Sequence, residues 1–349
     1  MFFDNLKEYK NFLSTKFIHR ITGVLRVSCG YDRLEELEDL KSLVGVQTLR
    51  IDDLYDDYVD DLARLINSSD TLEKIDLAYI DLREIPNQKI VNLFKSFSHI
   101  RWLSLVGASI DSSHLRYLAE YVLVHGRLKY LNLLRTFHLG MGESWVESFK
   151  IFAGSIKSLE TLIFGFNDVS GELINEIVSK IKGSSLKHLS FEYFTMFTGK
   201  INYIAKLADN LENINTLNLA GQSALREEWL SFFHNIRTSK VKKLIVSHMF
   251  IENSNNSTMD SELTNTISDS YKNLDLFSIS MVRFQPDLFH SLVSKIKDSK
   301  LRKINLSGKV QNPQESNNID WRYVAKQLIG VKFIKLSYNY ISKYSMYDI

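Results

Sequence analysis

The sequence predicts an α/β solenoid, a fold in which strand–turn–helix units repeat along the chain and stack on one another. Two observations favour this fold class. A short frame, apolar-x-x-apolar-x-apolar, recurs eleven times at intervals of 26 to 33 residues. Between many of these copies lie apolar residues with the spacing of one helical face. The chain of 349 residues is also longer than single compact cores usually grow, which favours an elongated array.

Each copy of the frame predicts a short strand. Its last two apolar side chains lie two residues apart, the period of a strand with one buried face. In the stretch HIRWLSLV, for example, Ile100, Leu103 and Leu105 are the inward residues. The eleven copies begin at Val46, Leu72, Ile100, Leu128, Leu159, Leu186, Ile214, Val241, Leu274, Leu301 and Val331.

A helix is predicted between successive strands. The pattern Val59/Leu62/Ala63/Ile66 has the i, i+3, i+4, i+7 spacing of a buried helical face, and similar patterns occur at 90–97, 115–122, 174–181 and 288–296. No single unit can bury both its strand face and its helix face. Neighbouring units therefore have to stack, with parallel strands on one side and helices on the other.

The recurring frame resembles that of leucine-rich-repeat proteins, and the repeat length with a full helix is similar to the ribonuclease-inhibitor-like subclass. The resemblance covers roughly residues 40–342 and implies a horseshoe of about 11–12 repeats with a parallel, concave sheet. One departure concerns the Asn that usually follows the frame. It is present only as Asn167 and Asn339. We expect other side chains to replace its hydrogen bonds, with irregular curvature as a consequence.

The two ends of the chain are interpreted as caps. Residues 1–40 form an N-terminal cap with a degenerate first repeat, helical in spacing from Phe2 to Phe17 and with a weak strand around Leu25 and Val27. Residues 41–349 form the repeat array with a C-terminal cap. Two polar stretches interrupt this pattern, 252–273, read as a loop or frayed helix, and 310–318.

Composition favours an intracellular protein, cytoplasmic or nuclear. The single cysteine, Cys29, cannot form an intramolecular disulfide, and the sequence has neither a signal-peptide pattern nor an apolar run long enough to span a membrane. The net charge is +2, but it is unevenly distributed. Residues 31–84 hold 16 acidic and 6 basic side chains, whereas residues 240–349 hold 16 basic and 10 acidic ones.

No motif predicts an enzyme, a cofactor or a metal site. The acidic run from Asp52 to Asp61 lacks the Gly and closing Glu of a calcium loop, so we read it as a strand end and helix start, with an acidic docking patch as the alternative. Cys29 and His19 have no third partner for nucleophilic catalysis. The stretch HLGMGESW, 138–145, lacks the Lys-Ser/Thr ending of a phosphate loop and is read as a long turn.

Nucleic acid is an unfavoured partner. The basic residues between Lys295 and Lys303 fall at a helix end, where positive charge complements the helix dipole. The chain's net charge is nearly neutral, and no nucleic-acid-binding motif accompanies this cluster. Whether the acidic 52–61 and basic 295–303 regions are docking sites stays open at this point.

The strand faces indicate a candidate binding surface. The third, fifth and seventh frame positions should point to the concave side, which makes Trp102 an outward residue beside Tyr130. With Arg135, Phe166 and Tyr193 in nearby register, these residues are expected to form an aromatic patch. Exposed aromatic and Arg side chains are enriched at interface hot spots. The alternative is that a return loop or cap covers them.

Function is predicted to be the binding of a protein partner on the concave face and the strand-end loops, as an adaptor, scaffold or inhibitor. This expectation follows from the resemblance, because protein binding is the common role of the family. Two alternatives are carried. One is a substrate receptor of a ubiquitin ligase, although residues 1–30 show no F-box motif. The other is a GTPase activator of the Ran-regulating type, although no catalytic residues of that group can be matched. The oligomeric state is not predicted.

Overall fold

The computed structural model describes residues 2–3, 23–28, 45–124, 127–137, 143–167, 169–193, 203–251, 259–282, 284–308, 319–337 and 339. The chain divides into two compact units, each described by itself below. Unit 1 comprises Met1–Val169 with Ser184–Leu186, and unit 2 comprises Ser170–Gly183 with Lys187–Ile349. The predicted boundary near residue 40 lies outside the described residues and stays a prediction.

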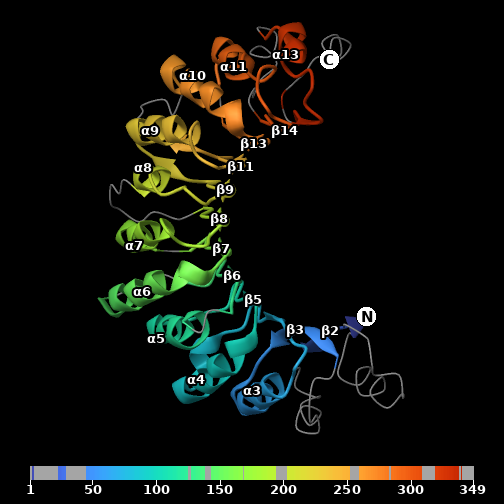
Figure 1. Cartoon of the computed structure of the whole chain (residues 1–349), viewed down its shortest axis with the longest axis vertical. Coiled ribbons are helices and arrows are strands. Elements are labelled where there is room, and N and C mark those ends of the chain that lie inside the picture. The colour runs from blue at the N-terminus through green and yellow to red at the C-terminus, as the bar shows by residue number, and fades with distance from the viewer. Residues whose placement is uncertain are drawn as a thin grey trace. The chain divides into compact units, whose positions relative to one another are not determined.

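Unit 1 contains a sheet of parallel strands whose order in space follows their order in the chain. The helices lie along one side of these strands (Figure 1). The strands are β1 Phe2–Phe3, β2 Gly23–Ser28, β3 Val46–Asp53, β4 Lys74–Asp76, β5 Trp102–Ser104, β6 Tyr130–Asn132 and β7 Thr161–Ile163. The α-helices are α3 Val59–Asn67, α4 Asn87–Ser96, α5 Ser112–Tyr117 and α6 Glu143–Ser155.

Short 3-10 turns and one π-helical turn complete the helical layer of unit 1. The 3-10 turns are Asp56–Tyr58, Leu82–Glu84, Phe97–His99 and Ile156–Ser158, and the π-helical turn is Leu118–Leu123.

Unit 2 repeats the same arrangement. Its sheet contains β8 His188–Ser190, β9 Thr216–Asn218, β11 Lys243–Ile245, β13 Leu276–Ser278, β14 Lys303–Asn305 and β15 Phe333–Lys335, all parallel. A separate two-stranded ladder joins β10 Ser223–Ala224 to β12 Phe250–Ile251. The helices are α7 Gly171–Ile181, α8 Tyr203–Ala208, α9 Arg226–Ile236, α10 Ser261–Asp269, α11 Pro286–Val293 and α13 Trp321–Gln327, with a 3-10 turn at Ser270–Asn273.

The strand register follows the sequence frame. The second apolar residue of each frame copy pairs with its counterpart in the next strand, so equivalent side chains form columns. In unit 1 the paired residues are Leu49, Ile75, Leu103, Leu131 and Leu162. In unit 2 they are Leu189, Leu217, Leu244, Phe277, Ile304 and Ile334.

The core lies between the sheet and the helices of each unit. Leu103 and Leu131 are fully buried, and so are the apolar residues on the inner face of α4, Ile90, Leu93 and Phe94. In the last frame copy the pattern fails, because Ile334 is 42% exposed. No strand follows β15 among the residues that the structure describes, so nothing there stacks on this inward side chain. The predicted α/β leucine-rich-repeat fold class is otherwise confirmed in both units.

One local expectation is corrected, and in another the helical alternative is the one present. Phe2 and Phe3 form strand β1, which pairs in parallel with β2, and not the start of a helix. Within the polar stretch 252–273, residues 261–273 form α10 and a 3-10 turn. Asp260 caps α10 by accepting the Leu263 N–H at 2.9 Å, and Leu263 and Ile267 are buried, so two apolar residues at helical spacing are enough to anchor it. The stretch 310–318 lies outside the described residues.

Candidate functional site

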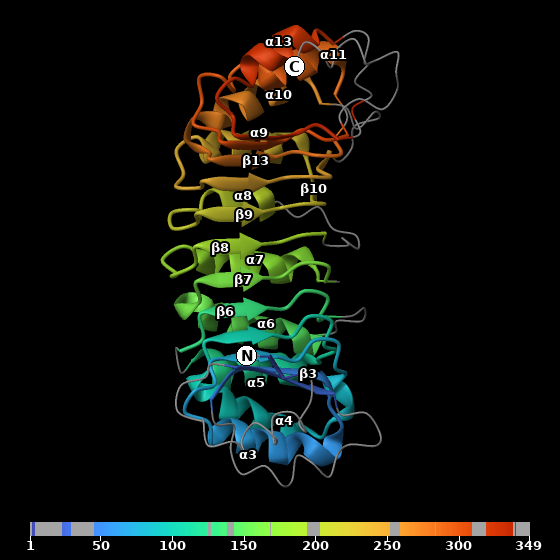
Figure 2. The same cartoon turned by 90° about the vertical axis from the view of Figure 1, so that its right-hand side faces the viewer.

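The third frame position of each repeat lies on the face of the sheet opposite the helices, here called the open face, which is turned toward the viewer in Figure 2. In unit 1 the parallel register places four side chains of this face side by side across neighbouring strands. They are Lys74, Trp102, Tyr130 and Thr161. Neighbouring strands are about 4.8 Å apart, so in-register aromatic residues meet face to face.

Trp102 and Tyr130 form a stacked aromatic pair on the open face. Their ring centroids are 4.9 Å apart and their planes are inclined by 14°. Both side chains are half-buried. An aromatic pair of this kind contributes about 0.5–1.5 kcal/mol beyond the area it buries, which holds both rings in a defined orientation. The open face therefore carries a rigid aromatic platform where the repeat frame itself requires no apolar residue.

Tyr130 retains its phenolic proton over a wide pH range. Burial raises the pKa of its hydroxyl, and the negative charge of Asp76 adds to that shift, while a hydrogen bond with Asn132 opposes it. Asn132 is held in turn, since its Oδ1 accepts the backbone N–H of Leu134 at 3.1 Å. The hydroxyl is therefore available as a neutral polar group at the edge of the platform.

Paired charges lie on the strands that precede the platform. The Nε of Arg50 is 3.2 Å from Asp52 Oδ1 and 3.9 Å from Asp76 Oδ2, and Arg26 forms a second ion pair with Asp52. Asp52, the first carboxylate of the acidic run, is thus paired with arginines of two neighbouring strands. Since these side chains are partly exposed, each such pair contributes little to stability.

Arg135 and Phe166 form a separate pair in the turns that follow β6 and β7. The guanidinium carbon of Arg135 lies 4.8 Å from the centroid of the Phe166 ring, a cation–π contact. Arg135 lies three residues beyond the end of β6, in the turn and not on the strand that holds Tyr130. Trp102 and Tyr130 thus form one pair on the strands, and Arg135 and Phe166 form another in the turns, while the larger aromatic patch stays a prediction.

Both turn residues adopt the left-handed backbone conformation that favours glycine. The φ angles are 55° at Arg135 and 54° at Phe166. The same frame position is left-handed in other repeats, where it holds Tyr79, Gly107, Tyr193, Gly221, His248, Met281 and Gly308. Bulky residues in this region carry backbone strain, and such strain is found at functional sites more often than elsewhere.

Tyr193 belongs to unit 2 and is described there by itself. Its ring lies 5.6 Å from the ring of His248 and packs over Gly221. Burial, followed by the charge of Glu192, raises the pKa of its hydroxyl. Tyr193 therefore contacts His248, which lies in a turn two repeats further along the chain.

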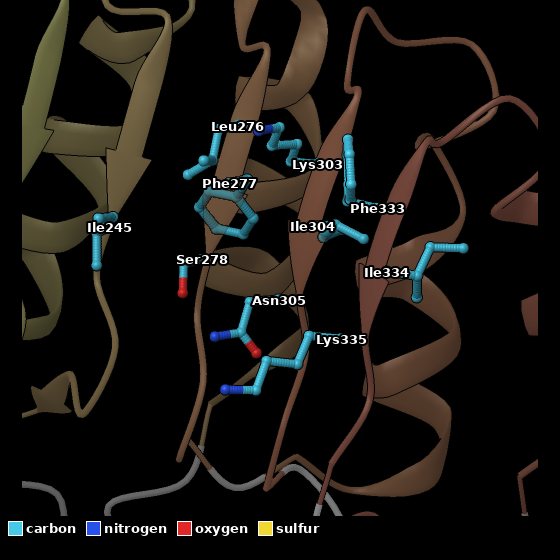
Figure 3. Close-up of a pocket in the computed structure, with 10 residues that line it drawn as sticks. All are labelled: Ile245, Leu276, Phe277, Ser278, Lys303, Ile304, Asn305, Phe333, Ile334 and Lys335. Carbon is cyan, nitrogen blue, oxygen red and sulfur yellow. The ribbon is translucent and has the colours of Figure 1, made fainter.

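Unit 2 also contains a shallow, largely apolar pocket of about 450 Å³ on the strands from β11 to β15 (Figure 3). Lys303 lies over the Phe333 ring, 4.7 Å from its centroid. The exposed Ile334 is part of the same lining. Sequence reasoning missed this pocket because it treats the last frame copy like the others, and the frame alone does not tell whether a later coil covers it.

The acidic run starts a helical turn after a strand, as its sequence predicts. Asp56 starts a 3-10 turn before α3, and Lys89 Nζ lies 2.7 Å from Asp56 Oδ1 and 4.0 Å from Asp60 Oδ2. In the described part of the chain, no three His, Cys, Asp or Glu side chains are grouped so that they could hold a metal ion. Cys29 and His19 lie outside the described residues.

Two other stretches from the sequence analysis are partly described, 138–145, which ends in a helix, and 295–303, which contains an ion pair. The end of HLGMGESW is corrected, because Glu143 begins α6 and Trp145 packs edge-on against Phe137 at 5.6 Å. In the basic stretch 295–303, Lys295 forms an ion pair with Asp269. Among the described residues, no helix has the length and apolar content that a membrane crossing requires.

No protein-family model matches the chain, and no curated protein matches it. Among solved structures, the crystal structure of a TLR13–ssRNA13 complex is similar over 96% of this chain, with 14% identity and a TM-score of 0.47. This chain covers 45% of that one, less than half its length.

The chain has a leucine-rich-repeat fold. This assignment rests on the frame and on the strand register of the two units described above. The RNA in the TLR13 complex is a ligand of that protein.

Proposed function

We propose that this repeat protein is a non-enzymatic binding module that holds a protein partner on the open face and the strand-end turns of unit 1. The observation that carries the proposal is the stacked pair of Trp102 and Tyr130 on a face where the repeat needs no aromatic residue. Large, oriented aromatic side chains lose little conformational freedom on binding and dominate interface energetics. Arg135 over Phe166 supplies a second anchor, and Tyr193 is a further contact residue of the proposal in unit 2.

The proposal includes finer statements that follow from the sequence. The repeats are assigned to the ribonuclease-inhibitor-like subclass, because a full helix follows most strands. The protein acts inside the cell as an adaptor, scaffold or inhibitor, with no enzymatic activity and no cofactor. Disproof of any one of these statements would leave the proposed binding site unaffected.

The experiment starts with affinity purification from the native cell, followed by mass spectrometry and purification of the candidate partner. Binding of that partner is then measured for wild type and for Trp102→Ala with Tyr130→Ala. We expect a loss of about 30-fold or more in affinity, the effect of removing a hot spot. Phe333→Ala is the matched control, since Phe333 occupies the same frame position on β15 and is 61% exposed. Wild-type affinity in the double variant would move the site elsewhere.

The two alternative functions are outcomes of the same work. Recovery of a ubiquitin-ligase adaptor bound directly to the purified chain would favour the substrate-receptor function. A GTP-hydrolysis assay with candidate GTPases tests the other class. Acceleration of hydrolysis by the wild-type chain would contradict the non-enzymatic function.

A further inference from the structure

A basic pocket lies beside the aromatic platform of unit 1. It has a volume of about 480 Å³ and is lined by His99, Arg101, Arg127 and Lys129. Arg101 immediately precedes Trp102, and Lys129 immediately precedes Tyr130. The pocket is therefore at the edge of the sheet where β5 and β6 begin.

The repeat geometry brings these four residues together. His99 and Arg127 each occupy the position just before a frame copy, while Arg101 and Lys129 each occupy its second position. Adjacent coils are in register here, because the backbone N–H of Lys129 donates to the Arg101 carbonyl at 2.9 Å. A basic pair in one coil is thus stacked directly on a basic pair in the next.

The positive charge of the pocket is not neutralised within the described part of the chain. Arg101 and Arg127 are exposed and form no ion pair with any described carboxylate, and Lys129 Nζ donates to the Ser158 carbonyl at 3.2 Å. The Nε2 atom of His99 is buried without a hydrogen-bond partner among the described residues. Burial lowers the pKa of His99, and the charge of Arg127 lowers it further, against the effect of Asp70. The three cationic side chains favour an anionic ligand, and the neutral ring of His99 can donate a hydrogen bond to it.

Glutamate residues occupy the equivalent position in the coils on both sides of the pocket. In the coil before Arg101 the equivalent position is Glu73, whose carbonyl accepts the Arg101 N–H at 2.9 Å. In the coil after Lys129 it is Glu160, whose N–H donates to the Lys129 carbonyl at 2.8 Å. The positive region therefore spans two coils, about 10 Å at the usual strand spacing. It fits one compact dianion, whereas a nucleic-acid strand places successive phosphates along a longer path and would meet the flanking glutamates.

We propose that this pocket binds one phosphoryl group carried on a phosphorylated side chain of the protein partner. A phosphate monoester carries a charge of about −1.5 to −2 at neutral pH and three strong acceptor oxygens. Arginine forks bind such oxygens in a bidentate manner, and lysine adds a point charge. The inference rests on the proposed function, because the open face holds the partner whose modified residue enters the pocket. It adds a requirement for phosphorylation.

The test uses small probes, so that it does not depend on the partner. Binding is measured by calorimetry at constant ionic strength for inorganic phosphate, for a short peptide with one phosphoserine, for the same peptide unmodified, and for a single-stranded RNA oligonucleotide. The variant is Arg101→Gln with Arg127→Gln. The matched control is Arg302→Gln, an exposed arginine that has the same frame position as Arg101, immediately before β14, and lies outside the pocket.

We expect the phosphopeptide to bind and the unmodified peptide not to bind. The double variant should weaken binding about tenfold or more, since hydrogen bonds to charged groups are stronger than neutral ones. Arg302→Gln should leave it unchanged. On the wild-type chain, inorganic phosphate should shift the NMR signals of the His99 ring and leave those of His234, an exposed histidine of unit 2, unchanged. This second readout holds even if the double variant fails to fold.

Several results would overturn the inference. One is equal phosphopeptide affinity in the wild type and the folded double variant. Another is binding of inorganic phosphate without the phosphopeptide, which would assign the pocket to a free anion. RNA bound more tightly than the phosphopeptide, and weakened by Arg302→Gln as well, would indicate an extended nucleic-acid surface. If the pocket behaves as expected but Trp102→Ala with Tyr130→Ala leaves partner binding intact, the proposed function fails and the pocket stands.

Discussion

The side chain of Asn167 bridges two coils of unit 1, with its Oδ1 accepting the backbone N–H of Thr136 at 2.8 Å. The same oxygen accepts the Phe137 N–H at 2.9 Å, and Nδ2 donates to the Leu133 carbonyl at 2.8 Å. Other repeats use different residues for the last of these bonds. Thr136 Oγ1 donates to the Leu105 carbonyl at 2.8 Å, and Gln222 Nε2 donates to the Phe191 carbonyl at 2.6 Å. The expected replacement of the asparagine bridge is therefore present at these two positions.

Asn167→Ala should destabilise the protein, because it leaves buried backbone groups of Thr136, Phe137 and Leu133 without their side-chain partner. Asn167 is fully buried, so water cannot replace it. An unsatisfied buried polar group costs about 1–3 kcal/mol, and we expect a total loss of roughly 3 kcal/mol in the free energy of unfolding. Urea denaturation measures it. Asn305→Ala is the matched control, because Asn305 is half-buried and its Oδ1 accepts one N–H, that of Ser307 at 3.1 Å. Equal losses would show that the bridge is unimportant.

Leu103→Asp should unfold the coils around β5. Leu103 is fully buried between its paired neighbours Ile75 and Leu131, so the aspartate would place a charge in a stacked apolar layer. Each coil depends on the next for burial, and the loss should reach about 3 kcal/mol or more. Circular dichroism during thermal unfolding reports it. Lys74→Asp, on the exposed side of β4, should leave the midpoint nearly unchanged, and a large shift there would argue against a face-specific effect.

The free energy of unfolding should decrease as the pH is lowered below 6.5, because of the buried His114. Its side chain is buried at the start of α5, where Nδ1 accepts the Asp111 N–H at 3.3 Å. Burial lowers the pKa of His114 below 6.5, against the opposing charges of Asp111 and Asp81. The unfolded chain then binds the proton at higher pH than the folded chain. The contribution of His114 to the free energy of unfolding is fully present above pH 6.5. It is lost as the pH falls toward the pKa that His114 has in the folded chain, and the free energy changes by at most about 1.4 kcal/mol per pH unit.

His114→Gln tests this dependence, because glutamine does not titrate and can still accept the Asp111 N–H. The pH profile of the unfolding free energy should be flatter below 6.5 in this variant than in the wild type. His234→Gln, a change on the exposed side of α9, is the control. A wild-type slope in His114→Gln would assign the dependence to other groups.

Gly221→Ala should lower the free energy of unfolding more than Gly183→Ala, a substitution at another glycine with a left-handed backbone. Gly221 has a φ of 71°, and an added Cβ would lie 2.6 Å from Tyr193 Cγ, inside any normal contact. Gly183 has a φ of 75° with nothing within 4 Å of an added Cβ, so Gly183→Ala measures the backbone strain alone. Strain costs about 1–2 kcal/mol, and the ring overlap should add to it at Gly221.

A double-mutant cycle with Tyr193→Gly separates the two terms, since removal of the ring should reduce the cost of Gly221→Ala to that of Gly183→Ala. Unfolding free energies of the four chains supply the cycle. Additive effects would mean that the Tyr193 ring moves aside freely.

Part of the candidate site follows from periodicity. Trp102 and Tyr130 occupy the same frame position in consecutive repeats, and parallel strands in register place such residues side by side. The pairing of Arg135 with Phe166 in the turns also reflects one frame position in consecutive repeats. What the spacing did not indicate is the left-handed backbone of Arg135 and Phe166, because the frame says nothing about turn conformation.

The sequence by itself determined the repeat unit, the inward columns and the open face of the strands, because a period of two along a strand and a fixed distance between coils leave little freedom. The tertiary structure decided which side chains bridge the coils, that Ile334 is exposed, and that His99, Arg101, Arg127 and Lys129 line one pocket. These features depend on how backbone turns direct side chains between coils about 30 residues apart in the chain, which a one-dimensional pattern does not contain.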